Sequence, residues 1–123
     1  MTDWAGPNLF PSEIRSATLQ QLRAVREDMM SAEWDLSMSA QTAAVKTAAA
    51  KKLVNVERAI LALENADLAA IRDKLVENEG DLLAGTAALA RARQNLAKVQ
   101  EVLQAVGVLI SIAAKVAKFV LVP

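Results

Sequence analysis

Hydrophobic residues recur along most of this chain at the spacing of an α-helix. From Leu82 to Val120, two apolar series each advance by seven residues. The first series contains Leu82, Leu89, Leu96, Leu103, Ile110 and Ala117, and the second contains Gly85, Ala92, Val99, Val106, Ala113 and Val120. A seven-residue repeat sustained over this length is typical of a helix that packs against other helices. The pattern predicts one helix over about 81–120.

The start of an earlier helix is marked by Pro11 and Ser12, which are followed by Glu13. Proline fits the first helical turn, serine is a good N-cap, and an acidic residue suits the positive end of the helix dipole. An apolar stripe with steps of three and four residues then follows: Leu22, Val25, Met29, Ala32 and Leu36. These features predict a helix over about 12–37. Residues 1–11 contain a glycine and two prolines and are expected to form an irregular N-terminal arm.

The segment 37–50 interrupts the register of this stripe. Large apolar residues are nearly absent from the segment, and the stripe resumes at Leu53 with a shifted phase. We favour a break or sharp bend here, with Ser39 capping a second helix over about 39–78. The alternative is one uninterrupted helix over 12–78.

Gly80 lies in the strongest turn signal of the later chain, directly after a run of polar residues. Glycine is the usual residue just beyond a helix C-terminus, because it adopts the left-handed conformation without steric cost. We therefore expect the helices 39–78 and 81–120 to form a long antiparallel, coiled-coil-like hairpin, with the N-terminal helix 12–37 packed beside it. The predicted fold class is all-α, a helical bundle in a single domain over 12–123.

The charges support this pairing. The chain has 14 basic and 14 acidic residues, and their excesses alternate in sign from one segment of the chain to the next. Alternating blocks suit antiparallel neighbours of opposite charge, although exposed ion pairs contribute only about 0–1 kcal/mol each. In the predicted hairpin, Arg91 and Arg93 would lie near Asp73 and Glu77.

The composition favours association with other helices. Alanine occupies 25 of the 123 positions and aromatic residues make up only 3%, so each residue buries little apolar area. The last turns of the helix 81–120 are apolar on nearly every side, and a thin hairpin would leave this surface uncovered. We expect a homo-oligomer, most simply a dimer, or binding of partner helices, and thus a non-enzymatic assembly or adaptor protein. Its predicted interface or core residues are Leu89, Leu96, Val99, Leu103, Val106 and Ile110.

A membrane-associated protein is the alternative function, with 102–122 as the membrane-binding segment. Its fully apolar run is too short for a spanning helix, which needs about 20 residues. Lys115 and Lys118 would each cost roughly 2.5–3.5 kcal/mol at the centre of a bilayer. An amphipathic helix lying on an anionic membrane surface is compatible with these lysines.

Several kinds of chemistry are not expected. The chain has no cysteine, histidine or tyrosine, which excludes disulfides and Cys/His zinc sites. Glu57, Glu64 and Asp67 follow one another along a predicted helix, but the common two-metal motif of helical bundles also needs histidine. We interpret these carboxylates as solvated charges. We predict no metal site, no cofactor and no catalytic residues, and therefore no enzyme.

Nucleic-acid binding is not expected either. Lys46, Lys51, Lys52 and Arg58 form a modest basic patch, but the net charge is zero and no aromatic residue lies beside them for base stacking. The N-terminus lacks the basic and apolar pattern of a secretory signal, and this favours the cytoplasm, although the absence of cysteine does not settle the compartment.

Overall fold

The computed structural model describes residues 10–123, and these residues are helical throughout except for short connections and the last six residues. The all-α prediction is therefore confirmed. Most of the predicted arm, 1–11, lies outside the described residues. The helices are α1 (Pro11–Met29), α2 (Ala32–Ser39), α3 (Ala43–Asn65), α4 (Leu68–Glu77), α5 (Glu79–Ala92) and α6 (Val99–Ala117).

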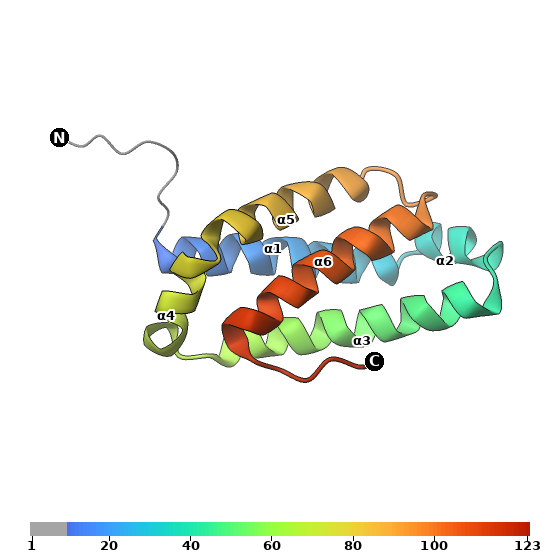
Figure 1. Ribbon diagram of the computed structural model, residues 1–123. Coiled ribbons are helices and arrows are strands. Elements are labelled where there is room, and N and C mark those ends of the chain that lie inside the picture. The colour runs from blue at the N-terminus through green and yellow to red at the C-terminus, as the bar shows by residue number, and fades with distance from the viewer. Residues whose placement is uncertain (1–9) are drawn as a thin grey trace.

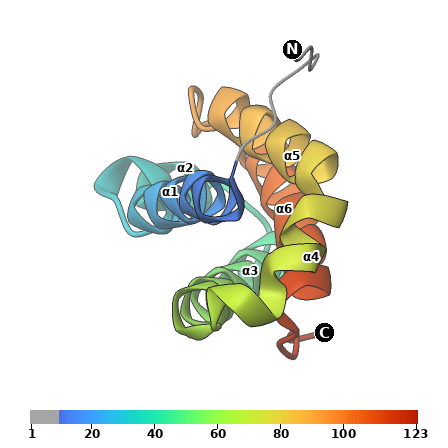
Figure 2. The same ribbon diagram turned by 90° about the vertical axis from the view of Figure 1, so that its left-hand side faces the viewer.

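Four of these helices form a bundle. Helix α1 packs on α3 and α5, and α6 packs on the same two helices from the opposite side. Figure 2 looks along the bundle and shows α1, α5, α6 and α3 in that order around its axis. In Figure 1, α1 and α5 run in one direction and α3 and α6 run in the other. The neighbours α1 and α5 are therefore parallel, and so are α3 and α6.

Helix α4 explains this unusual order. It connects α3 to α5, which occupy diagonally opposite corners of the bundle (Figure 2). On its way across the end of the bundle it contacts both α1 and α6. Its buried residues, Ile71 and Leu75, close that end of the core.

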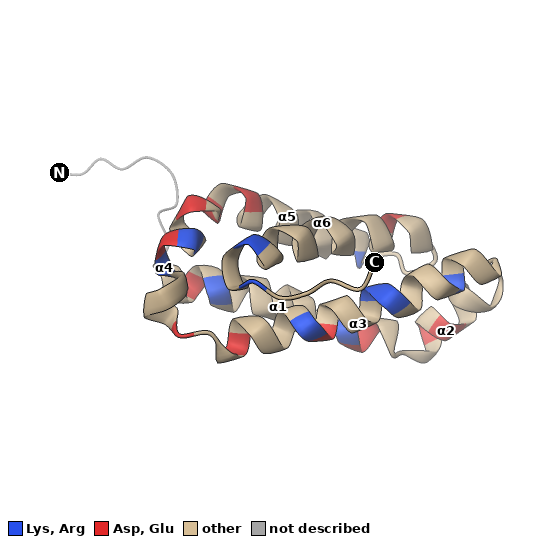
Figure 3. Ribbon diagram, turned by 60° about the horizontal axis from the view of Figure 1, so that its bottom comes forward, with Lys and Arg blue, Asp and Glu red and all other residues tan. Residues whose placement is uncertain are grey.

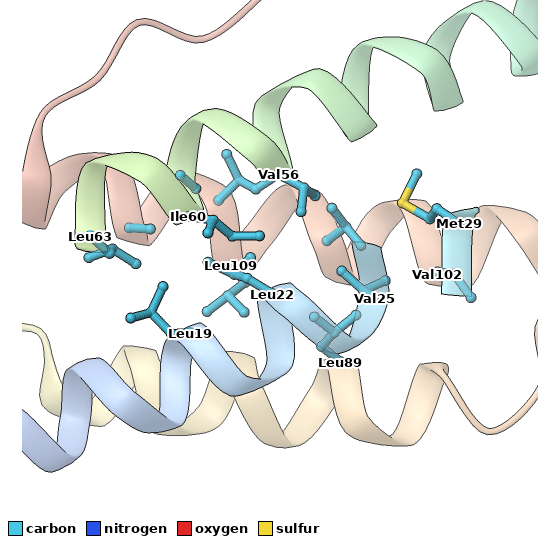
Figure 4. Packing of buried hydrophobic residues seen from close by; sticks show 14 of the residues in the cluster. Leu19, Leu22, Val25, Met29, Val56, Ile60, Leu63, Leu89, Val102 and Leu109 are labelled. Carbon is cyan, nitrogen blue, oxygen red and sulfur yellow. The ribbon is translucent and has the colours of Figure 1, made fainter. Parts of the chain in front are cut away.

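The core is built from the apolar stripes of all four long helices. Figure 4 shows side chains such as Leu22 and Val25 of α1, Ile60 of α3, and Leu89 and Leu109 of the other two helices meeting in the interior. These side chains are almost completely inaccessible to water, with exposed fractions of 0–1%. Full burial of one such side chain stabilises the fold by about 1.5–3 kcal/mol.

The three predicted helices are each divided in two, because small polar side chains cap new helices inside them. The hydroxyl of Ser31 accepts a hydrogen bond from the Trp34 amide at 3.2 Å, and that of Thr42 accepts one from Val45. The carboxylate of Asp67 accepts one from Ala69. Such caps satisfy backbone N–H groups that would otherwise lack a partner at a helix start. The region 12–78 is therefore neither one helix nor two, but four.

The predicted single helix 81–120 is also wrong. The chain leaves α5 at Ala92 and enters α6 at Val99, and the Asn95 side chain accepts a hydrogen bond from the Ala97 amide at 3.1 Å. Asparagine competes with the helix backbone in this way. As a result, α5 and α6 fold back on each other, and the long hairpin of 39–78 with 81–120 does not form.

Two predicted caps lie elsewhere. Ser39 is the last residue of α2, and Thr42 caps the next helix instead. Gly80 lies inside the first turn of α5, because the chain turns at Asn78, two residues earlier. The predicted helix start is confirmed, since α1 begins at Pro11 and the Glu13 carboxylate accepts a hydrogen bond from the Phe10 amide at 2.9 Å.

The predicted hairpin would have placed Arg93 near Asp73 and Glu77 of α4, but Arg93 binds to α1 instead. Its Nε donates to Oδ2 of Asp28 at 2.6 Å, and its Nη1 donates to Oε1 of Gln21 at 3.3 Å. Both ionic side chains are about one quarter exposed. This pair ties the C-terminal end of α5 to its parallel neighbour α1.

Candidate interaction surface

The residues predicted from the heptad seam all lie inside the single chain. They are Leu89, Leu96, Val99, Leu103, Val106 and Ile110, with exposed fractions between 0 and 8%. These residues are core residues, and the seam is filled by the chain's own helices. Leu103, the most exposed of them, also lines the edge of a surface groove.

The first half of α3 is the part of the bundle that its neighbours cover least. Over 43–54, Ala49 is the one buried residue, whereas the second half of the helix buries a residue at nearly every inward position. Most of this half belongs to the segment 37–50, in which large apolar residues are nearly absent, so its side chains are small. This half of α3 lies beside the first half of α6 (Figure 1).

Three hollows meet on this side of the molecule. The largest, of about 540 Å³, lies over the outer surface of α6 and extends to Lys52. The second, of about 220 Å³, lies between α3 and α6, where Ala44 and Ala48 line one side and Leu103 lines the other. We call the surface formed by the first two hollows the α3–α6 face. Its residues are Ala44, Val45, Ala48 and Lys52 of α3, with Gln100, Leu103, Gln104, Gly107, Val108, Ser111 and Ile112 of α6.

The Lys52 side chain lies over Gly107 of α6 at this face. A Cβ atom at Gly107 would lie 3.0 Å from Nζ of Lys52 and 3.2 Å from its Cε. The obstacle is the flexible end of the lysine, which can shift to make room for a small side chain. The side chain of Val108, one residue further, is 50% exposed at the rim.

The third hollow, of about 280 Å³, lies between α3 and the C-terminal end of the described chain. It is lined by Ala44, Thr47, Ala48, Lys51, Lys52, Asn55, Val122 and Pro123. Residues 118–123 leave α6 and return along α3, to which Val120 and Val122 are hydrogen-bonded (Figure 3). The third hollow thus lies between the end of this segment and the first half of α3.

The electrostatic character of this region is basic. Lys46, Lys51 and Lys52 lie on the first half of α3, and no acidic side chain of the described chain forms an ion pair with any of them. The ion pairs that the structure contains lie elsewhere, for example between Arg23 and Glu64. A ligand of this region would therefore meet unneutralised positive charge beside small apolar side chains.

The carboxylates considered for metal binding are not gathered together. Glu64 pairs with Arg23, Asp67 caps α4, and Glu57 is exposed on α3. Among residues 10–123, no group of three or more acidic side chains is placed to hold a metal ion.

Helix α6 is the one helix of the described chain that has the length and composition of a membrane span. Eight of its residues are buried in the bundle, from Val99 to Val116. The core helices of bundles in water share this composition.

Asn55 is the residue of this region that the sequence analysis missed. It is only 5% exposed and binds the backbone of Val122. The available signal was a single asparagine in the apolar run Leu53, Val54 and Val56, because a buried amide needs a polar partner.

Comparisons of the chain with protein-family models, with curated proteins and with solved structures found no match.

Proposed function

We propose that this chain is a non-enzymatic helical assembly protein that forms a dimer through the α3–α6 face. The observation that supports this proposal is the first half of α3, which is a regular helix although its own bundle buries only one of its residues, Ala49, and covers Val45 and Leu53 in part. A short Ala-rich helix gains little stability from its own hydrogen bonds. A surface of small side chains beside a hollow allows a further helix to approach closely.

The chain carries a helix of complementary character in α2. Leu36 is 76% exposed there, close in the chain to the exposed residues Glu33 and Asp35, which precede it. An exposed leucine flanked by negative charge matches an apolar groove flanked by Lys51 and Lys52. We therefore propose that α2 of one copy docks on the α3–α6 face of the second copy, and that the second α2 docks reciprocally, as twofold symmetry requires.

The mass of the protein in solution tests this proposal. Light scattering across a concentration series should give the mass of a dimer for the natural chain. Val108→Asp at the rim and Leu36→Asp on α2 should each give a monomer, because each places a charge inside an apolar contact. Val76→Asp is the matched control, since Val76 is 54% exposed on α4, away from the face, and the chemical change is identical.

A charge-reversal pair tests the orientation of the contact. Lys51→Glu with Lys52→Glu should weaken the dimer, and adding Glu33→Lys with Asp35→Lys should restore it. A natural chain that remains monomeric at high concentration would refute the dimer, and an effect of Val76→Asp equal to that of Val108→Asp would refute the assigned face.

Membrane binding through 102–122 is the rival function, supported by the composition of α6 and by the exposed side chains of Lys115, Lys118 and Val120. Flotation with vesicles of anionic lipid distinguishes the two. Binding that is lost in Lys115→Glu with Lys118→Glu, without any change of mass in vesicle-free buffer, would favour the membrane.

A further inference from the structure

The buried amide of Asn55 uses its hydrogen bonds on the backbone of one residue. Its Nδ2 donates to the carbonyl oxygen of Val122 at 3.2 Å, and the Val122 amide donates to its Oδ1 at 2.7 Å. An asparagine that satisfies both the N–H and the C=O of a residue holds a peptide backbone irrespective of the side chain that this residue carries.

A second contact on α3 has the same character. Nη1 of Arg58, one turn along the helix from Asn55, donates to the carbonyl oxygen of Val120 at 2.9 Å. Over 119–121 the side chains of the held segment alternate, because Phe119 and Leu121 are half-buried against the core whereas Val120 is 77% exposed. Backbone hydrogen bonds with alternating side-chain pockets are the mode by which proteins bind extended peptides.

A hollow adjoins the residues that occupy this line. Its volume is about 280 Å³, and its lining includes Val122 and Pro123 together with Lys51 and Lys52 of α3. Neither lysine forms an ion pair with an acidic residue of the described chain. A longer peptide with acidic residues in this position would gain charge-assisted contacts that the segment 118–123 does not make.

The present occupant is attached through a strained residue. Lys118, at which the chain leaves α6, has a φ of 50°, and it is the one non-glycine residue of the described chain with a positive φ. This conformation costs a lysine free energy that a glycine would not lose. The strain reduces the free energy by which the segment 118–123 is held on α3, so a competing peptide displaces this segment more easily.

We propose that α3 carries a recognition site for an extended peptide of another protein, with apolar residues at alternate positions followed by acidic residues. The segment 118–123 is the internal occupant that such a peptide displaces. This inference rests on the proposed assembly role, because it adds a kind of partner to it. The peptide backbone is held by Asn55 and Arg58, which lie outside the α3–α6 face, whereas Lys51 and Lys52 serve both proposals.

The experiment uses the full chain and a synthetic peptide. Leu121→Asp opens the site, because an aspartate cannot remain against the apolar core, and it leaves α3 unchanged. The probe is the fluorescein-labelled peptide KFVLVPEE, which is the segment 118–123 extended by two glutamates, followed by fluorescence anisotropy. The opened chain should bind this peptide at least ~10-fold more tightly than the natural chain, since a tethered competitor has an effective concentration in the millimolar range.

Asn55→Leu added to the opened chain should reduce the affinity by ~10-fold or more, whereas Asn65→Leu, on an exposed position of the same helix, should not change it. The neutral probe KFVLVPSS should bind several-fold more weakly than the acidic probe, and only the acidic probe should lose that advantage at high salt. If Leu121→Asp impairs folding, Val122→Pro opens the site instead, because it removes only the N–H that Asn55 accepts.

A folded, opened chain that binds neither probe would overturn the inference and would make Asn55 a structural clamp. Equal binding of the two probes would overturn the acidic preference. A doubled mass of the natural chain that depends on Asn55 and not on Val108 would show that the segment 118–123 of a second copy is the occupant, and would overturn the assignment to another protein. The mass measured with Val108→Asp tests the dimer separately.

Discussion

The two halves of α3 belong to one continuous helix but differ in how much of each is buried in the bundle. The second half, 55–65, buries Val56, Ala59, Ile60 and Leu63 between α1 and α6. The first half, 43–54, buries Ala49 alone. Both halves have regular helical hydrogen bonding, so the difference lies in side-chain size and not in backbone conformation.

This difference separates the half of α3 that contributes to the core from the half whose surface stays largely accessible. The large residues of the second half contribute to the core, and replacing them affects stability directly. The small residues of the first half contribute little to the core, although they keep a helix in position beside Lys52 and the hollows. Three experiments test this contrast, beginning with the largest expected effect.

Ile60→Ala should destabilise the protein by about 2–5 kcal/mol, because it leaves a cavity at a position that is 1% exposed. Val54→Ala, at a position that is 40% exposed on the same helix, should change the free energy of unfolding by less than about 0.5 kcal/mol. Urea denaturation followed by circular dichroism measures both. Similar losses for the two variants would mean that the first half of α3 is covered in solution.

Amide hydrogen exchange should divide α3 at the same point. The amides of 56–63 should exchange mainly through global unfolding, whereas those of 46–52 should exchange through local opening, roughly 100-fold faster. The comparison is made at a protein concentration at which the chain is monomeric, because a docked partner would protect the first half. Uniform protection of α3 in the monomer would remove the distinction between its halves.

Two glycines contrast the core with the rim. A Cβ at Gly85 would lie 3.2 Å from the side chain of Leu109, which is fully buried, so Gly85→Ala overpacks the core and should destabilise by about 1 kcal/mol. At Gly107 the obstacle is the flexible end of Lys52. Gly107→Ala should therefore stabilise by about 0.5–1 kcal/mol through helix propensity. Thermal unfolding measures both effects: the melting temperature should fall for Gly85→Ala and rise for Gly107→Ala.

Much of the bundle can be read from the sequence, because its core positions follow helical periodicity. The first three residues of the α1 stripe, Leu22, Val25 and Met29, face the interior as predicted, and so do Leu89 and Ile110. The last two residues of the predicted stripe, Ala32 and Leu36, are exposed on α2, so this part of the prediction is wrong. The start of α1 at Pro11 is also correct, since a proline and an acidic residue act locally.

The helix ends could not be predicted from periodicity. The heptad series continues through Leu96 and Val99 although the chain reverses between α5 and α6. Residues of a tight connection can occupy the same core layer as the helices that they join, so the repeat gives no sign of the break. Asn95 was the local signal, but an asparagine inside a helical pattern marks a turn only where tertiary packing favours the reversal.

The candidate sites depend on contacts that no local pattern encodes. Asn55 and Val122 are 67 residues apart, and Asp28 and Arg93 are 65 apart. Their pairing follows from the diagonal connection through α4, which could not be derived from the helix stripes. The sequence identified the lysines of α3 as a patch, but the groove beside them required the position of α6.

The diagonal path of α4 also has a consequence for biosynthesis. Helices α1 and α3 are synthesised before α5 and α6. They pack on each other, but the apolar sides that they turn toward the core are covered only when α5 and α6 have been added. Contacts between residues so distant in the chain form late, because a long loop must close before they are made. While the ribosome extends the chain from Asn78 to Ala117, we expect Leu22 and Ile60 to lack their contacts with α5 and α6, and this gives a chaperone that recognises apolar helices time to bind.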